Sequence, residues 1–193
     1  MEKIIKLTEK YPDKDWDWQY ISENPNLTMD FIEKHIDKNW SWYGISSNPN
    51  ITMDFIEKYI DEDWEWEWQG ISDNPNLTID FINKYPDKPW DWQGISKNPN
   101  ITMEMIEKYP DKDWDWKTIS TNSNISMEDI QNNPDKPWDW KGISRNPNLT
   151  VEIIDKYPDK PWNWGYYGIS DNPNLTVEFI DKYPDKDWNW REI

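Results

Sequence analysis

The 193-residue chain contains no cysteine, a single histidine (His35) and only six glycines. The absence of cysteine excludes disulfides and thiol chemistry. One histidine without cysteine excludes His-based catalytic triads and ordinary zinc sites within one copy of the chain. No glycine-rich loop of the kind that cradles phosphate is present. These absences predict a protein that is not an enzyme and that holds no cofactor or metal ion.

Long apolar runs are also missing. No stretch approaches the length of a membrane-spanning helix, and residues 1–6 lack the apolar segment of a signal peptide. We therefore expect a soluble cytoplasmic protein that does not enter a membrane.

Positive charge is scarce, with 21 Lys and Arg against 38 Asp and Glu, a net charge of −17. Binding to nucleic-acid backbones or anionic lipids needs clustered cations, so neither is an expected partner. A basic protein partner remains compatible with this charge, and negative charge also keeps an aromatic-rich surface soluble.

The mean hydropathy of −1.11 is low enough to resemble a disordered chain. The average conceals 17 Trp, 10 Tyr and 4 Phe. Each of these side chains can bury roughly 150–250 Å², which is enough to predict a folded chain.

Most of the tryptophans belong to a Trp-x-Trp doublet that recurs every 24 or 26 residues. The first members of the doublets are Trp16, Trp40, Trp64, Trp90, Trp114, Trp138, Trp162 and Trp188. An Asn-Pro-Asn triplet keeps the same interval, with Asn122-Ser123-Asn124 in one slot. A period of this length indicates a tandem array of one supersecondary unit.

The first half of each repeat predicts a short helix, as in residues 100–109. Thr102 is a suitable N-cap, Glu104 favours the first turn, and Pro110 ends the helix. Ile101 and Ile106 are spaced as a hydrophobic staple. The threonines expected to cap these helices are Thr28, Thr52, Thr78, Thr102, Thr150 and Thr176.

The second half, residues 111–120, allows either a strand or a second helix. Trp114 and Trp116 alternate with polar residues, as in a strand, but Ile119 breaks this period. A helix is favoured because prolines such as Pro89 occur at its expected start and asparagine can take the left-handed position at its end. Gly before the Ile-Ser pair is expected to admit an aromatic ring, and the serine to form hydrogen bonds at the helix end.

These features predict an all-α fold, an α-solenoid of about seven 24-residue helical hairpins. The alternative is a leucine-rich-repeat-like α/β solenoid. We expect a single repeat domain over 1–193, with an N-terminal capping half-repeat at 1–12, tandem repeats over 13–187 and a partial repeat at 188–193.

Two repeats are longer by two residues, and alignment from their C-terminal ends places the insertions near 64–65 and 162–163. Insertions are tolerated in loops. The alignment leaves Trp64 and Trp162 outside the repeating core, and we predict that these two indoles bind a partner. The regular doublets are predicted to pack in the core; they include Trp16, Trp18, Trp40, Trp42, Trp90, Trp92, Trp114, Trp116, Trp138 and Trp140.

The combination of Asn74–Thr78, Pro86–Trp92 and Ile95-Ser96 resembles the short Trp-rich tandem repeats of proteins from giant viruses that infect amoebae. The resemblance covers nearly the whole chain. It implies a solenoid with no assigned chemistry and, for a viral protein, a location in the host cytoplasm. His35-Ile36 and Tyr59-Ile60 depart from the pattern because they lack the proline that ends the helix.

Acids alternate in Asp13-Lys14-Asp15-Trp16-Asp17, as at the start of a calcium loop. The glycine and glutamate that such a loop requires are absent in register, so helix-start acids explain the pattern better.

The sequence thus predicts a non-catalytic, monomeric scaffold that presents an acidic, aromatic-rich surface to an unknown protein. Two alternatives stay open. One is a carbohydrate- or cation-binding array of exposed tryptophans; the other is a purely structural or engineered repeat scaffold.

Overall fold

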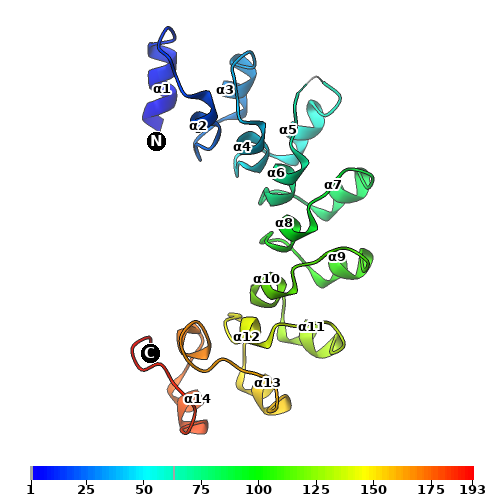
Figure 1. Cartoon of the computed structure of the whole chain (residues 1–193), viewed down its shortest axis with the longest axis vertical. Coiled ribbons are helices and arrows are strands. Elements are labelled where there is room, and N and C mark those ends of the chain that lie inside the picture. The colour runs from blue at the N-terminus through cyan, green and yellow to red at the C-terminus, as the bar shows by residue number, and fades with distance from the viewer. Residues whose placement is uncertain (1, 63) are drawn as a thin grey trace. The chain divides into compact units, whose positions relative to one another are not determined.

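A computed structural model describes residues 2–62 and 64–193 of the chain (Figure 1). They fall into two compact units, Met1–Asn100 and Ile101–Ile193. All regular structure in the described residues is helical, without any strand, and it repeats at intervals near 24 residues. The all-α tandem array is therefore confirmed, and the leucine-rich-repeat-like alternative is wrong because the described second halves are not extended ladders.

Two kinds of short helix alternate after a longer first helix, α1 (Glu2–Lys10). Helix B of a repeat begins at the second Trp of the doublet, and helix A follows the Asn-Pro-Asn triplet. In the first unit the B helices are α2 (Trp18–Ser22), α4 (Trp42–Ser47), α6 (Trp68–Asp73) and α8 (Trp92–Ser96). The A helices are α3 (Met29–Lys34), α5 (Met53–Lys58) and α7 (Ile79–Lys84). The B helices follow one another along one side of this unit and the A helices along the other (Figure 1).

The second unit continues the alternation. Its A helices are α9 (Met103–Lys108), α11 (Met127–Asn132), α13 (Val151–Lys156) and α14 (Val177–Lys182). Its B helices are α10 (Trp116–Thr121) and α12 (Trp140–Ile143), and a single 3₁₀ turn, η1 (Ile169–Asp171), takes the place of the next one.

Helix A starts where a threonine can satisfy an orphan amide. The Thr52 hydroxyl accepts from the backbone amide of Phe55 at 3.2 Å, and Thr28, Thr78, Thr102 and Thr176 act in the same way. Ser126 replaces threonine in α11 and forms a full capping box with Asp129. Thr150 occupies the cap position of α13, but its hydroxyl accepts from no backbone amide of the described helix and donates to the Glu152 carboxylate instead.

Helix B begins later than the prolines indicate. The cap of α8 is Asp91, whose carboxylate accepts from the amide of Gln93 at 3.1 Å. Pro89 therefore lies before the cap, in the segment that leads to Trp90, and the prediction that it opens the helix is wrong. The acid between the two tryptophans ends the extended segment because it satisfies an early helix amide.

Asparagine closes helix B in an extended conformation, not in the left-handed one. Asn48, after α4, has φ −67° and ψ 129°, and Asn74, after α6, has φ −69° and ψ 124°. Their side chains donate hydrogen bonds to the preceding repeat.

The glycines of helix B allow two backbones to approach, and no aromatic ring enters beside them. A Cβ on Gly70 would lie 2.8 Å from both the Ser46 Cβ and the Tyr43 carbonyl oxygen of the preceding repeat. The prediction of an inserted aromatic ring is therefore wrong at this position.

The core is a line of aliphatic side chains between the two kinds of helix. Each regular repeat buries an Ile of helix B, the Leu or Ile before the helix A cap, and an apolar residue inside helix A, as with Ile45, Ile51 and Ile56. Ile101 and Ile106 of the predicted staple are both buried. Burial of one such side chain contributes about 1.5–3 kcal/mol. Among the described residues, no helix is both long and apolar enough to cross a bilayer.

Candidate functional site

The first indole of each doublet is a core element anchored by its N–H group. Trp40 is buried and donates from Nε1 to the His35 carbonyl oxygen at 2.8 Å. The same bond ties Trp66, Trp90, Trp114, Trp138, Trp162 and Trp188 to the residue that follows helix A, at 2.8–3.0 Å. Trp16 forms this bond with Tyr11 but is only half-buried.

The second indole is half-buried and joins one repeat to the next. Trp68 and Trp90 pack in a T-shaped pair with ring centroids 5.0 Å apart and an interplanar angle of 88°. The equivalent pairs are Trp18–Trp40, Trp42–Trp66, Trp116–Trp138, Trp140–Trp162 and Trp164–Trp188, at 5.0–5.6 Å. Edge-to-face pairs of this kind contribute about 0.5–1.5 kcal/mol beyond their buried area.

In several described repeats, a lysine of the following repeat lies over the face of this indole. Lys88 lies 4.9 Å above Trp68, Lys160 lies 4.9 Å above Trp140, and Lys186 lies 5.1 Å above Trp164. Each lysine comes two residues before the next buried Trp. The recurring indole faces therefore accept a cation, and at these positions the chain supplies it.

Trp64 takes the place of that lysine in the third repeat. It lies two residues before Trp66, contacts Trp42 of the preceding repeat with centroids 5.4 Å apart, and stacks on Tyr59 at 4.1 Å with an interplanar angle of 4°. Its indole is half-buried. The insertion near 64–65 thus adds an aromatic side chain to the end of the core and leaves Trp66 and Trp68 in the regular doublet.

Trp162 does not lie outside the core. It is 9% exposed and donates to the Tyr157 carbonyl oxygen at 2.9 Å, as the other first indoles do. The two additional residues follow Trp164 and not residue 161: the Ser170 hydroxyl reaches back six residues to the Trp164 carbonyl oxygen, whereas the regular distance is four residues. The insertion placed near 162–163 is therefore misplaced, and Trp162 offers almost no surface to a partner.

This second insertion changes the local backbone. Gly165, Tyr166 and Tyr167 form a loop before η1, and Tyr167 has a positive φ of 51°. Both tyrosines are more than half exposed. The exposed aromatic residues of this repeat are therefore these tyrosines, which alignment of the doublets did not single out.

The loop before Trp66 is the most acidic connection between a helix A and a doublet. Residues 60–67, here called the Trp64 loop, contain five acids and no lysine, whereas each of the other loops contains an Asp-Lys pair. The described acids Asp61, Glu62, Glu65 and Glu67 are exposed. Within the described part of the chain, no cluster of acids, His or Cys has the arrangement of a metal site.

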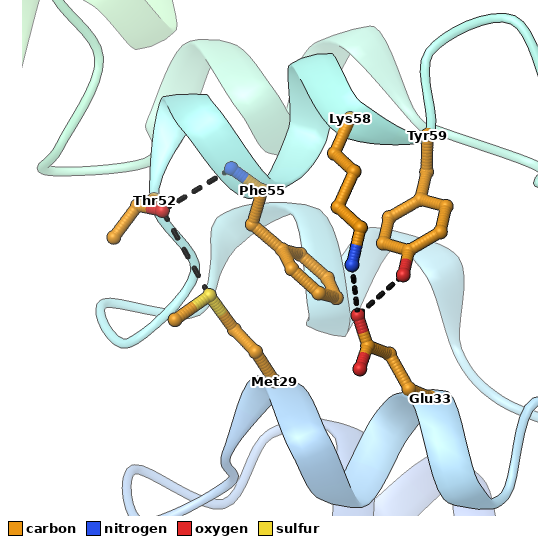
Figure 2. Close-up of polar contacts among 6 residues, drawn as sticks. All are labelled: Met29, Glu33, Thr52, Phe55, Lys58 and Tyr59. Atoms are coloured by element: carbon orange, nitrogen blue, oxygen red, sulfur yellow. Dashed lines mark hydrogen bonds and ion pairs between the residues drawn. The ribbon is translucent and has the colours of Figure 1, made fainter.

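A ladder of ion pairs connects successive A helices. Glu33 of α3 accepts from both Lys58, at 2.9 Å, and the Tyr59 hydroxyl of the next repeat (Figure 2). These two bonds, the tyrosine first, lower the pKa of the Glu33 carboxyl below its ordinary value. The other pairs are Lys34–Glu9, Lys84–Glu57 and Lys182–Asp155. They are exposed and explain the recurrence of Lys-Tyr at the end of helix A.

The Asn-Pro-Asn triplets and the Ile-Ser serines form hydrogen bonds between repeats. Asn74 is buried and donates to the carbonyl oxygens of Ser46, Asn48 and Ile51 at 2.8–3.2 Å. The Ser46 hydroxyl accepts from the Glu67 amide at 3.2 Å. The hydrogen bonds predicted for the serines at the helix end are present, as between the Ser72 hydroxyl and the Trp68 carbonyl oxygen at 2.8 Å. The role of asparagine was not predicted, although its fixed spacing from the serine was the available signal.

His35 lies in the slot that holds Tyr59 and its equivalents. Its ring packs on Phe31 and Trp18 at 4.6 and 5.3 Å, and its buried Nε2 lacks a hydrogen-bond partner among the described residues. Burial, followed by repulsion from Lys34 and Lys38, lowers the pKa of the imidazole. The imidazole therefore occupies the space of a tyrosine ring, and its Nε2 atom has no hydrogen-bond partner among the described residues.

Comparison with known proteins identifies no relative: no family model, no curated protein and no solved structure matches the chain. The resemblance to giant-virus repeats thus stays a prediction, while the tandem repeat of short, Trp-led helices stands on the structure itself.

Proposed function

We propose that the chain is a non-catalytic repeat scaffold in the cytoplasm that binds a basic protein segment at the Trp64 loop. The observation that carries the proposal is local. This loop combines a half-exposed indole with acids that no lysine of the loop offsets.

Elsewhere the chain satisfies its own indole faces with lysines such as Lys88 over Trp68. At the Trp64 loop the equivalent cation is absent from the sequence, and an additional aromatic side chain stands there instead. A Lys or Arg from a partner can approach both the indole and the carboxylates of Glu62 and Glu65. Cation–π contact contributes about 0.5–1 kcal/mol at an exposed site, and the acids steer a basic partner toward the loop.

The carbohydrate-binding alternative has less support. Sugars need open indole faces, whereas lysines lie over the described second indoles Trp68, Trp140 and Trp164, and neighbouring indoles pack against the first ones.

The test is binding of a fluorescein-labelled, Lys- and Arg-rich peptide, followed by anisotropy at 50 and 300 mM NaCl. We expect Trp64→Ala combined with Glu62→Gln, Glu65→Gln and Glu67→Gln to weaken binding about tenfold or more. The matched control removes three exposed acids from regular loops, by Asp87→Asn, Asp135→Asn and Asp159→Asn. Equal weakening by both variants contradicts the proposal, because it means that only overall charge matters.

A further inference from the structure

The repeats of α10 and α12 carry more positive charge at their surface than the repeats of α4 and α6. Two positions of each repeat decide this: the residue after the second Trp, and the residue after the Ile-Ser pair. In the repeats of α4 and α6 these residues are Tyr43, Ser47, Gln69 and Asp73. In the repeats of α10 and α12 they are Lys117, Thr121, Lys141 and Arg145. The three cations are exposed, and they stand together in a chain whose net charge is −17.

In the first unit, residues at these two positions bond from one repeat to the next. The Tyr43 hydroxyl donates to the Asp73 carboxylate at 2.8 Å. The corresponding residues of the second unit are Lys117 and Arg145, so two cations stand where a donor and an acceptor meet in the first unit. The backbones are also close, since a Cβ on Gly142 would lie 3.2 Å from the Lys117 carbonyl oxygen. Two neighbouring cations repel each other, and an anion between them removes the repulsion.

Lys141 lacks the acid that the repeat pattern offers it. Asp171 occupies the corresponding position of the next repeat, but its carboxylate accepts from the Tyr167 backbone amide at 2.7 Å. The two-residue insertion brings Tyr167 to this place with a positive φ of 51°. Within the described part of the chain, none of the three cations forms an ion pair.

The three cations line a common cavity of about 140 Å³, here called the Lys117 cavity, with Thr121, Asp139, Gly142 and Tyr167. The guanidinium carbon of Arg145 lies 5.1 Å from the centre of the Tyr167 ring. This contact holds one face of the guanidinium and leaves the N–H groups at its edge for a ligand. Asp139 is the acid among the lining residues, and it caps α12 by accepting from the Lys141 amide at 3.2 Å. Three cations and one acid leave two positive charges in the lining.

These charges match a phosphate monoester better than a carboxylate. A phosphate on a side chain carries about −1.5 to −2 at pH 7 and has three acceptor oxygens, whereas a single carboxylate leaves about one positive charge uncompensated. Arginine binds phosphate through two N–H groups, and lysine binds it as a point charge. The cavity is smaller than the roughly 300–1,000 Å³ of pockets that enclose small molecules. It therefore takes the phosphate group alone, and the group that carries the phosphate lies along the exposed surface.

We propose that the Lys117 cavity binds a phosphorylated side chain of a partner peptide. Lys117, Lys141 and Arg145 contact the phosphate oxygens, and Tyr167 is a positioning residue that holds the guanidinium. The strained backbone of Tyr167 fits this role, because such strain is concentrated at ligand sites. The Lys117 cavity and the Trp64 loop attract partners of opposite charge, so each proposal can fail without the other.

The test uses the full chain and a short fluorescein-labelled peptide that is uncharged apart from a central phosphoserine. Fluorescence anisotropy should show binding about tenfold or more tighter than that of the same peptide with serine or glutamate at the centre. Lys117→Gln combined with Arg145→Gln should remove about tenfold or more of the affinity, because hydrogen bonds to charged groups are lost. The matched control, Lys14→Gln combined with Lys97→Gln, removes two exposed lysines outside the cavity and should leave binding unchanged. Equal binding of the three peptides, or equal loss in both double variants, overturns the proposal.

Two further measurements separate the parts of the proposal. Tyr167→Ala should weaken binding about two- to fivefold through loss of the cation–π contact, and Tyr167→Phe should retain the affinity because the ring stays. Phosphoserine as a free amino acid should compete far more weakly than the phosphopeptide. Competition at equal concentration would mean that the cavity takes free phosphate monoesters, which overturns the assignment to a peptide. Trp64→Ala should leave phosphopeptide binding unchanged, and a loss in that variant contradicts a separate site.

Discussion

At the scale of single residues, asparagine links one repeat to the next. The amide of Asn74 reaches three carbonyl oxygens of the preceding repeat, and its Oδ1 accepts from the amide of Asn76 at 2.8 Å. Short B helices leave terminal carbonyls that the helix cannot satisfy, so a buried donor from the next repeat is required.

Asn74→Ala is expected to lower the free energy of unfolding by about 1–3 kcal/mol, because it leaves buried carbonyl groups without a donor. Urea denaturation followed by far-UV circular dichroism measures the loss. Asn24→Ala is the matched control: it removes the same turn bond to Asn26, but Asn24 has no earlier triplet repeat to reach. An equal loss in both variants would show that the turn, and not the bond between repeats, stabilises the fold.

His35→Tyr is expected to raise the free energy of unfolding by about 1 kcal/mol. The new hydroxyl can donate to Glu9, as Tyr183 donates to Asp155 at 2.6 Å. The pKa of His35 is lower in the folded state than its ordinary value near 6.5. The unfolded chain therefore takes up the proton first as pH falls through about 6.5, and stability is lost toward acid.

The variant lacks this loss, so its advantage over the unmodified chain grows between pH 8 and pH 5. Denaturation midpoints at the two pH values measure it. If the variant and the unmodified chain differ in stability by the same amount at both pH values, His35 does not contribute to the pH dependence. If the variant is less stable than the unmodified chain, the tyrosine does not fit the position.

At the scale of elements, the register between the doublet and the Ile-Ser pair decides whether helix B forms. The regular repeat reads Trp42-Tyr43-Gly44-Ile45-Ser46 and forms α4. In Trp164–Ser170 the same sequence is interrupted by the two additional residues Gly165 and Tyr166. The 3₁₀ turn η1 forms there in place of a B helix. Both ends of the segment from Trp162 to Ser170 keep their regular hydrogen bonds: Trp162 donates to the Tyr157 carbonyl oxygen, and the Ser170 hydroxyl accepts from the Asn189 amide at 2.9 Å.

Deletion of Gly165 and Tyr166 restores the regular sequence and is expected to turn η1 into a helix like α4. The positive φ of Tyr167 disappears with it, and we expect the free energy of unfolding to rise by about 1 kcal/mol or more. Helix content by circular dichroism and urea midpoints measure the change. Deletion of Trp64 and Glu65 is the comparison: because that insertion precedes the doublet, helix content should stay constant. A loss of helix in the first variant contradicts the assigned register.

At the scale of the whole molecule, charge opposes folding while the A-helix ladder favours it. The net charge of −17 repels itself. The four exposed ion pairs each contribute at most about 1 kcal/mol. Repulsion is therefore expected to dominate, and raising NaCl from 20 to 300 mM at pH 7 should increase the thermal midpoint. Near pH 4.3, where the net charge vanishes, the increase should disappear. A lower midpoint in salt at pH 7 would show that the ion pairs outweigh the repulsion.

Much of this architecture follows from local chemistry that the sequence displays. Threonine before an acid, proline after a Lys-Tyr pair and a fixed Trp interval are enough to predict the helices, their period and the all-α class. The caps and breakers act within about ten residues, so a single repeat contains them, and the Trp interval gives the period of the array.

The remaining features join residues more than 20 positions apart, and spacing alone does not reveal them. The buried Asn74 and the half-buried Asn76 are the same residue type, and so are the buried Trp162 and the half-buried Trp64. Only the packing of one repeat on the next decides which indole is enclosed and which carbonyl needs a donor. The sequence by itself determined the short helices and their interval, because caps and breakers act locally; the tertiary structure decided the place of each insertion and the surface left open, because burial is a property of neighbours.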